Sequence, residues 1–263
     1  MTPSSPIRLE VAKGLAHVVL DLPERGNPIS YAFVQALEDV TLQCADCSDV
    51  RAVLISAEGA RFSVGGDITE FTADLDALPA LMRRWNASLN ASVARLQRMN
   101  APVVAAVHGV IAGGALSVIS GADIIVAGAQ TRFVAAYASI GFCPDIGGTA
   151  SLVRRIGAQR ARRFHLMHEQ LDAQEAERIG LADFVVPGAQ VLERARAVAE
   201  QFARGPTLAY GEIKRLMLSA QQAPLEQQLE LETQALVRLV RTEDSRGALR
   251  AFLDKRPPVY SGR

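Results

Sequence analysis

Two glycine-rich segments are placed to hold a negative charge with backbone N–H groups. Gly113 and Gly114 follow the apolar run 103–107 and open an expected helix, and the first N–H groups of a helix have no partner within it. The second segment, Phe62–Asp67, also follows an expected strand and contains Gly66. Either segment alone is equally explained as a turn that requires positive φ. Together they can each direct one N–H at a single carbonyl oxygen, which predicts an oxyanion site.

A carboxylate stands in a third glycine-rich segment. Asp145 follows Pro144 and precedes Gly147 and Gly148. It has two interpretations, either as the cap of a helix that opens near Gly147 or as a group that takes up and returns protons. Neither oxyanion segment ends in Gly-Lys-Ser/Thr, so a nucleotide phosphate cradle is not predicted.

Metal and redox chemistry is not predicted either. Cys44 and Cys47 have the spacing of a redox or zinc motif, but no second Cys/His pair accompanies them. His108 lies next to the 103–107 run and is expected as a satisfied core histidine. His165 and His168 are expected on the surface of a helix.

Short β-rich runs alternate with helical patterns through the first half of the chain, which predicts an α/β protein. The expected strands cover residues 7–11, 15–20, 50–55, 102–107, 122–127 and 132–133, and the expected helices cover 31–44, capped by Ser30, and 78–99. Beyond Gly188 we expect helices over 191–203, 207–219, 225–241 and 245–255. These helices have more apolar surface than they can bury among themselves, so they are expected to pack on the main body or on a neighbouring subunit.

Charge and composition exclude several classes of protein. The 28 basic and 28 acidic side chains of the 263 residues cancel, so neither nucleic acid nor an anionic membrane surface is predicted as a partner. No apolar run is long enough to span a membrane, and the first residues lack the pattern of a signal peptide. Three cysteines cannot form a disulfide framework. We predict a cytoplasmic protein.

The order of these motifs resembles the crotonase, or enoyl-CoA hydratase/isomerase, superfamily. The resemblance covers nearly the whole chain and rests on residues 22–27, 59–68, 107–114, 122–124, 140–149 and 252–258. It implies the α/β crotonase (ClpP-like) spiral of stacked ββα units. Residues 1–200 would form the core with the acyl-CoA site, and residues 201–263 a helical segment that assembles trimers or dimers of trimers.

The resemblance also implies roles for individual residues. The amides of Gly66 and Gly114 would form the oxyanion hole for the carbonyl of an acyl-CoA thioester, the substrate, and no cofactor is implied. Arg25 and the backbone around Val64 and Asp67 would meet CoA, although Asp67 is equally explained as a structural cap. Further candidates for substrate contacts are Ile68, Ile111, Gly113, Ser117, Tyr137 and Phe142, and candidates to shape the acyl site are Phe71, Trp85 and Leu89.

The chain departs from the hydratase pattern at two positions. Hydratases of this family use two glutamates, and Ser117 and Tyr137 stand at the aligned positions. Asp145 resembles the aspartate of members that shift a double bond, and one carboxylate suffices for a 1,3-proton shift. We therefore predict an enoyl-CoA isomerase, with an enoyl-CoA hydratase or a non-catalytic acyl-CoA-binding homologue as alternatives. Related dehalogenases use an aspartate here as a nucleophile, but Asn90 and Tyr137 replace their histidine and tryptophan.

Overall fold

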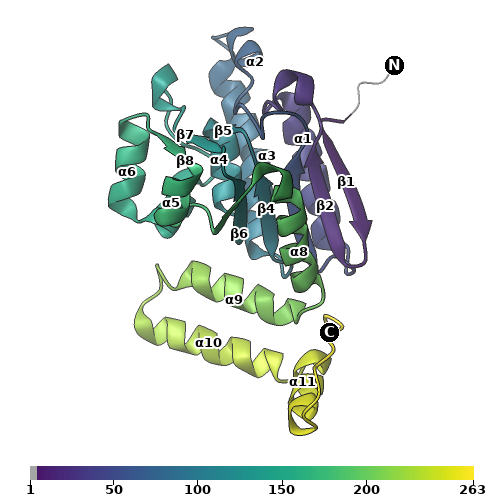
Figure 1. Cartoon of the computed structure of the whole chain (residues 1–263). Coiled ribbons are helices and arrows are strands. Elements are labelled where there is room, and N and C mark those ends of the chain that lie inside the picture. The colour runs from purple at the N-terminus through teal and green to yellow at the C-terminus, as the bar shows by residue number, and fades with distance from the viewer. Residues whose placement is uncertain (1–4) are drawn as a thin grey trace.

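The larger of two sheets forms the centre of the molecule. The computed structural model describes residues 5–263. The strands of this sheet are β1 (Ile7–Ala12), β2 (Leu15–Leu20), β3 (Ala52–Ala57), β4 (Val103–Val107), β6 (Ile124–Gly128) and β9 (Phe184–Val186). They lie in the order β1-β2-β3-β4-β6-β9 (Figure 1). The β1–β2 pair is an antiparallel hairpin, and every other pair in this sheet is parallel.

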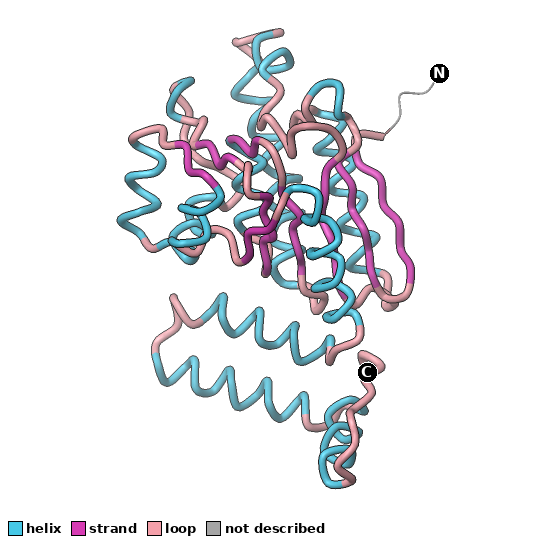
Figure 2. Tube along the Cα trace, viewed as in Figure 1, coloured by secondary structure: helices cyan, strands magenta, loops and turns pink. Residues whose placement is uncertain are grey.

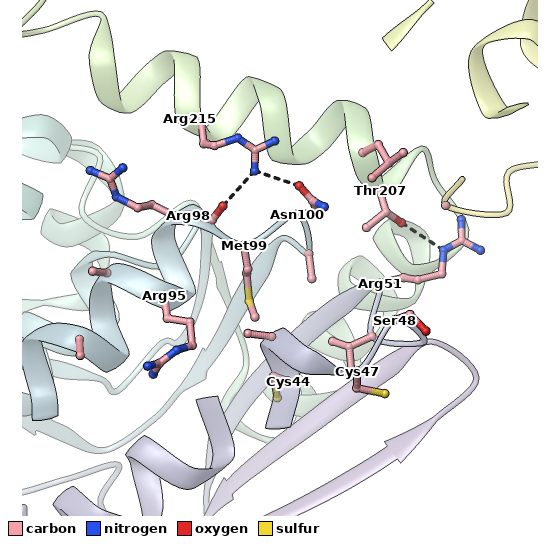
Figure 3. A pocket seen from close by; sticks show the side chains of 17 residues that line it. Cys44, Cys47, Ser48, Arg51, Arg95, Arg98, Met99, Asn100, Thr207 and Arg215 are labelled. Carbon is pink, nitrogen blue, oxygen red and sulfur yellow. Dashed lines mark hydrogen bonds between the residues drawn. The ribbon is translucent and has the colours of Figure 1, made fainter. Parts of the chain in front are cut away.

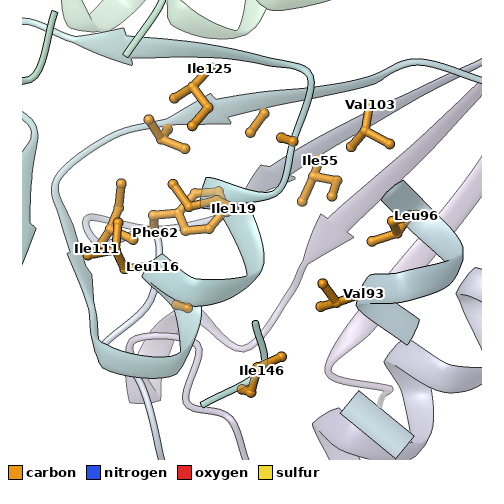
Figure 4. Close-up of a cluster of buried hydrophobic side chains, with 14 of the residues drawn as sticks. Ile55, Phe62, Val93, Leu96, Val103, Ile111, Leu116, Ile119, Ile125 and Ile146 are labelled. Atoms are coloured by element: carbon orange, nitrogen blue, oxygen red, sulfur yellow. The ribbon is translucent and has the colours of Figure 1, made fainter. Parts of the chain in front are cut away.

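Helices cover both faces of this sheet. They include α1 (Tyr31–Asp46), α3 (Leu78–Arg98) and α4 (Gly113–Ser120) on one face and α8 (Val191–Ala203) on the other. Val53 and Ile55 of β3 face the α3 side, where they share a core cluster with Leu96 (Figure 4). Ala52 and Leu54 face the α8 side. Because parallel strands are buried on both faces, they appear in the sequence as continuous apolar runs.

A smaller three-stranded sheet leads into the Gly113–Gly114 segment. It consists of β5 (Val110–Ala112), β7 (Arg132–Val134) and β8 (Gln170–Asp172). Beside it lie α5 (Gly148–Ile156), α6 (Ala158–Leu166) and α7 (Ala173–Arg178) (Figure 2). The remaining short helices are α2 (Ile68–Thr72), η1 (Pro23–Arg25), η2 (Ala138–Ile140) and η3 (Gly188–Gln190). Strand β5 leads directly into α4.

The C-terminal helices extend below the sheets (Figure 1). They are α9 (Thr207–Ser219), α10 (Leu225–Leu239) and α11 (Glu243–Leu253). Lys214 of α9 is buried; its Nζ donates to the carbonyls of Leu96 at 3.0 Å and Ala101 at 2.8 Å and lies 2.8 Å from a carboxylate oxygen of Asp123. Large apolar side chains remain exposed on these helices, including Met217, Leu225, Leu236, Phe252 and Leu253.

The α/β prediction is confirmed. The 7–20 hairpin, the strand at 102–107 and the four C-terminal helices all form, and the Ser30 hydroxyl accepts from the Phe33 amide at 3.2 Å to cap α1 as expected. The division at residue 200 and the assembly role of the tail stay predictions. Among residues 5–263, no helix combines the length and apolarity needed to cross a bilayer.

Candidate active site

The two glycine segments lie next to each other. Ser63 pairs with Ile111 in an isolated bridge, because the Ser63 amide donates to Val110 at 3.1 Å and the Ala112 amide donates to the Ser63 carbonyl at 3.1 Å. At Gly65 (φ +88°) a Cβ would come within 2.8 Å of the Ala112 carbonyl oxygen. Only glycine fits this close approach of two backbones.

Both predicted oxyanion donors are available. A parallel bridge between Ile29 and Gly66 holds the first segment, with the Ile29 amide donating to Gly65 at 2.8 Å and the Asp67 amide to Ile29 at 2.9 Å. Gly114 lies in the first turn of α4. Within the described part of the chain, neither the Gly66 amide nor the Gly114 amide donates a hydrogen bond. Two free backbone N–H groups beside one cavity can receive a developing negative charge.

These glycines and Asp145 line one cavity of about 230 Å³. Asp145 is the only carboxylate among its lining residues in the described structure, and most of the wall is apolar. Of the predicted substrate contacts, the cavity brings together Val64, Ile68, Gly113, Tyr137 and Phe142, together with the acyl-site candidates Phe71, Trp85 and Leu89.

A chain of hydrogen bonds ends on Asp145. The Tyr137 hydroxyl donates to Oδ1 of Asp145 at 2.5 Å, and the Ser117 Oγ lies 2.9 Å from the same hydroxyl. A phenol has one proton, so Ser117 acts as the donor to the Tyr137 oxygen. Burial, with the Asp145 charge as the next cause, raises the pKa of Tyr137 above its ordinary value. The phenol therefore keeps its proton at neutral pH and fixes one oxygen of Asp145.

The helix-cap interpretation of Asp145 is wrong. The cap of α5 is Gly147, in the left-handed conformation at φ +74°, and no side chain accepts at that helix end. The Asp145 side chain turns to Tyr137, and only its backbone carbonyl meets the helix, accepting from the Gly148 amide at 2.9 Å.

Ile146 is a site residue that the sequence did not reveal. Its φ is +54°, which a β-branched side chain rarely adopts, and its Cδ1 would lie 3.4 Å from a Cβ at Gly114. Backbone strain of this kind costs on the order of 1–3 kcal/mol and clusters at functional sites. The turn at Ile146 connects the carboxylate of Asp145 to the glycine turn that opens α5. No composition or spacing rule marks an isoleucine for this conformation.

Arg25 and Asp67 do not line the cavity. Arg25 Nη2 lies 2.6 Å from Oδ2 of Asp67, which is 4% exposed, and Oδ1 of Asp67 accepts from the Thr69 amide at 3.1 Å. Asp67 is therefore the N-cap of α2. Arg25 stays half-exposed. The pair anchors the segment that contributes Val64 and Ile68 to the cavity wall.

Two other predicted contacts lie behind the cavity wall. Ile111 is fully buried in the main core cluster, and Ser117 is 2% exposed beneath Tyr137. A Cβ at Gly148 would come within 2.2 Å of the Ser117 Oγ, so α4 and α5 are packed closely at this point. Ser117 therefore meets Tyr137 rather than the open cavity.

The prediction for His165 is wrong, and that for His168 is right about its exposure but not about its helix, because α6 ends at Leu166. His168 is exposed, whereas both ring nitrogens of His165 are buried without a hydrogen-bond partner in the described structure. The His165 ring packs against Phe164 and, edge to face, against Tyr137 at a centroid distance of 6.4 Å. Burial lowers its pKa. His108 is half-buried, and its Nε2 lies 2.8 Å from the Gly59 carbonyl oxygen.

A second cavity of about 640 Å³ lies between the body and α9 (Figure 3). Its wall contains Cys44, Cys47 and four arginines but none of the residues predicted for the active site. Two of the arginines hold α9 to the body: Arg215 donates to the Arg98 carbonyl at 3.0 Å, and Arg51 donates to Thr207 at 3.1 Å. The guanidinium groups of Arg51, Arg95 and Arg215 donate to protein oxygens, so this cavity is a weaker candidate for chemistry.

The chain is similar to proteins of one known family. Residues 10–263 match the family model described as enoyl-CoA hydratase/isomerase. The chain is 33% identical over 258 residues to a protein of Rhodobacter capsulatus named "Probable enoyl-CoA hydratase", with 98% of each chain covered. It is 32% identical over 254 residues to the 1,2-epoxyphenylacetyl-CoA isomerase of Escherichia coli, covering 96% of this chain and 97% of that one.

The fold agrees as well. The crystal structure of an enoyl-CoA hydratase from Polaromonas sp. JS666 superposes with a TM-score of 0.91 at 28% identity, covering 97% of this chain and 99% of that chain. The predicted crotonase-type α/β fold is confirmed by this match. Because the family model matches residues 10–263 of the 263, the chain belongs to the enoyl-CoA hydratase/isomerase family of enzymes that act on CoA thioesters.

Proposed function

We propose that this protein shifts the carbon–carbon double bond of an enoyl-CoA thioester, with Asp145 as the acid/base. The observation that carries the proposal is that Asp145 is the single carboxylate lining the cavity in the described structure, beside the free amides of Gly66 and Gly114. A 1,3-proton shift needs one such group on one face of the substrate.

The reaction has two steps. Asp145 removes a proton from the α carbon of a 3-enoyl thioester, and the negative charge spreads to the thioester oxygen, which the amides of Gly66 and Gly114 hold. The protonated Asp145 then returns the proton to the γ carbon, and the double bond ends between the α and β carbons. The paired amides lower the barrier because they bind the enolate oxygen more strongly than the neutral carbonyl.

Tyr137 acts on this reaction as a positioning residue. Its hydroxyl occupies Oδ1 of Asp145, so the second carboxylate oxygen is left for the substrate. Hydration would require a carboxylate that activates water and a second group that protonates the α carbon. The cavity supplies one carboxylate in the described structure, and the raised pKa of Tyr137 makes the phenol a weak proton donor to carbon.

The test is an assay of the purified protein with 3-enoyl-CoA and, separately, 2-enoyl-CoA. An isomerase increases the near-ultraviolet absorbance of the conjugated thioester from the first substrate, whereas a hydratase removes it from the second. We expect the first result, and we expect Asp145→Asn to lower that rate by about 10²–10⁴-fold while CoA-thioester binding persists.

Asp39→Asn serves as the matched control, because Asp39 is exposed on α1 and away from the cavity. Turnover of 2-enoyl-CoA alone would replace the proposal with a hydratase. Binding of both thioesters without turnover would indicate a non-catalytic homologue.

A further inference from the structure

The acyl part of the cavity has an aromatic wall. Phe71, Trp85, Tyr137 and Phe142 all line it, although aromatic residues make up only 5% of the chain. The Phe71 ring lies 5.5 Å from the Trp85 ring and 6.0 Å from the Phe142 ring, both in tilted arrangements. These are the distances at which aromatic rings attract one another beyond their burial of apolar area.

This wall adjoins the oxyanion hole. A Cβ at Gly66 would lie 2.5 Å from Cζ of Phe71, so the Phe71 ring lies directly against the glycine whose amide is a predicted donor. A group attached close to the thioester carbonyl therefore meets Phe71 first. An apolar cavity of about 150 Å³ holds a benzene ring, and this cavity of about 230 Å³ has room for a ring and its linking atoms.

Trp85 has a buried N–H group that needs a hydrogen-bond acceptor. It is 2% exposed, and its Nε1–H is buried with no hydrogen-bond partner in the described structure. An unpaired buried donor is costly, and native structures contain few of them. Asn86, the next residue of α3, also lines the cavity and is half-buried. The indole of this wall residue thus carries a buried donor that has no acceptor among residues 5–263.

Phe71 lies beside this indole, with 5.5 Å between the ring centroids. It is on α2, a helix of five residues with no fully buried residue, and its side chain is half-buried against the main core cluster. Because Nε1 is buried, an acyl oxygen reaches it only when this wall shifts.

We infer that the acyl group accepted here carries a ring with an oxygen atom on it, which packs against Phe71 and, as the wall shifts, accepts a hydrogen bond from Trp85 Nε1. The inference rests on the proposed function, since it takes the acyl end of a CoA thioester as the group that fills the cavity. It specifies the substrate class, an oxygen-bearing cyclic acyl-CoA rather than a straight-chain one.

The test measures binding of saturated thioesters that have no double bond to shift. The ligands are octanoyl-CoA, phenylacetyl-CoA, and the ortho-, meta- and para-hydroxy forms of phenylacetyl-CoA. Trp85 is the only tryptophan of the chain, so its fluorescence reports on this cavity directly. We expect phenylacetyl-CoA to bind about two- to tenfold more tightly than octanoyl-CoA, and at least one hydroxy form to bind about tenfold more tightly again.

Two variants assign these differences to residues, with calorimetry as the readout. Trp85→Phe keeps a ring but removes the N–H, so the advantage of the hydroxy form is expected to fall to within about twofold while plain phenylacetyl-CoA still binds. Phe71→Leu is expected to reduce the preference for a ring over a chain. Asn90→Ala, exposed on the same helix and outside the cavity wall, is the control and should retain both preferences.

The outcomes separate this inference from the proposed function. Equal binding of octanoyl-CoA and phenylacetyl-CoA, or no gain from any hydroxy form, overturns the inference and leaves the isomerase proposal intact. The wild-type ligand series decides this even if a variant fails to fold. Failure of every acyl-CoA to bind overturns both, whereas the predicted series without turnover of 3-enoyl-CoA supports the inference and contradicts the isomerase.

Discussion

The Tyr137 hydroxyl donates a hydrogen bond to Oδ1 of the Asp145 carboxylate at an oxygen–oxygen distance of 2.5 Å. Tyr137→Phe removes this donor and leaves the ring. We expect kcat for isomerisation to fall by about tenfold with little change in KM, because one hydrogen bond to a charged group contributes about 1.5–3 kcal/mol and only part of that orients Asp145. Steady-state kinetics tests this, and an unchanged kcat would show that the bond does not position the carboxylate. Ser117→Ala, one bond further away, should have the smaller effect.

A side chain at the first oxyanion glycine should disrupt the site. In Gly66→Ala the new Cβ would lie 2.5 Å from the Phe71 ring, so the ring or the loop must shift. We expect kcat/KM to fall by about 10²–10³-fold, the usual cost of losing one oxyanion donor. The control is Gly247→Ala on α11, where a Cβ meets nothing within 4 Å and where alanine favours the helix. Equal activities of the two variants would argue against Gly66 as a donor.

Burial of His165 gives the folded protein a sensitivity to acid. Burial lowers the pKa of this ring below 6.5, so the folded state binds its proton less readily than the unfolded chain. The stabilising difference is complete above about pH 6.5 and is lost as pH falls through the lower folded-state pKa. We expect the free energy of unfolding to decline below pH 6.5 and the decline to become shallower in His165→Phe.

Urea unfolding at a series of pH values measures this effect. The remaining decline contains a share from His17, whose pKa is also lowered by burial and by Arg196. His168→Asn is the surface control, because His168 is exposed and asparagine tolerates its positive φ of 53°. A decline equally steep in wild type and His165→Phe would contradict the assignment.

The exposed apolar residues of the tail should be buried between subunits. Phe252 is 81% exposed and Leu253 is 79% exposed, and burying such a side chain fully contributes about 1.5–3 kcal/mol. Light scattering should therefore give a mass three or six times 28.2 kDa. The double variant Phe252→Ser and Leu253→Ser should lower that mass, whereas Val11→Ser, an exposed apolar position on β1, should not. A monomeric wild type would refute the trimer.

The elements that the sequence predicted are those with long patterns. The buried strands at Val53 and Val104 are long enough to stand out as continuous apolar runs, and the amphipathic stretch 78–98 is long enough to show a helical period. Strands β5 and β8 have three residues each, too few for a period to appear. Their places are set by pairing with β7, a contact that arises only in the folded chain.

The sequence predicted the parts of the site that depend on residue type, but not the parts that depend on where a side chain points or how the backbone turns. Gly66, Gly114 and Asp145 were predicted and line one cavity. The bond from Tyr137 to Asp145, the unusual φ of Ile146 and the burial of His165 all depend on how α5 and α6 pack, and no local pattern encodes that packing.

The candidate active site forms only when the long-range bridge between Ser63 and Ile111 has formed. The two predicted oxyanion donors, Gly66 and Gly114, belong to segments far apart in the chain, and the hydrogen bonds at this bridge join those segments. A collapsed chain with correct helices but without this pairing would hold no enolate. Recovery of turnover during refolding therefore reports the formation of one long-range β contact, and it should lag behind the recovery of helical circular dichroism.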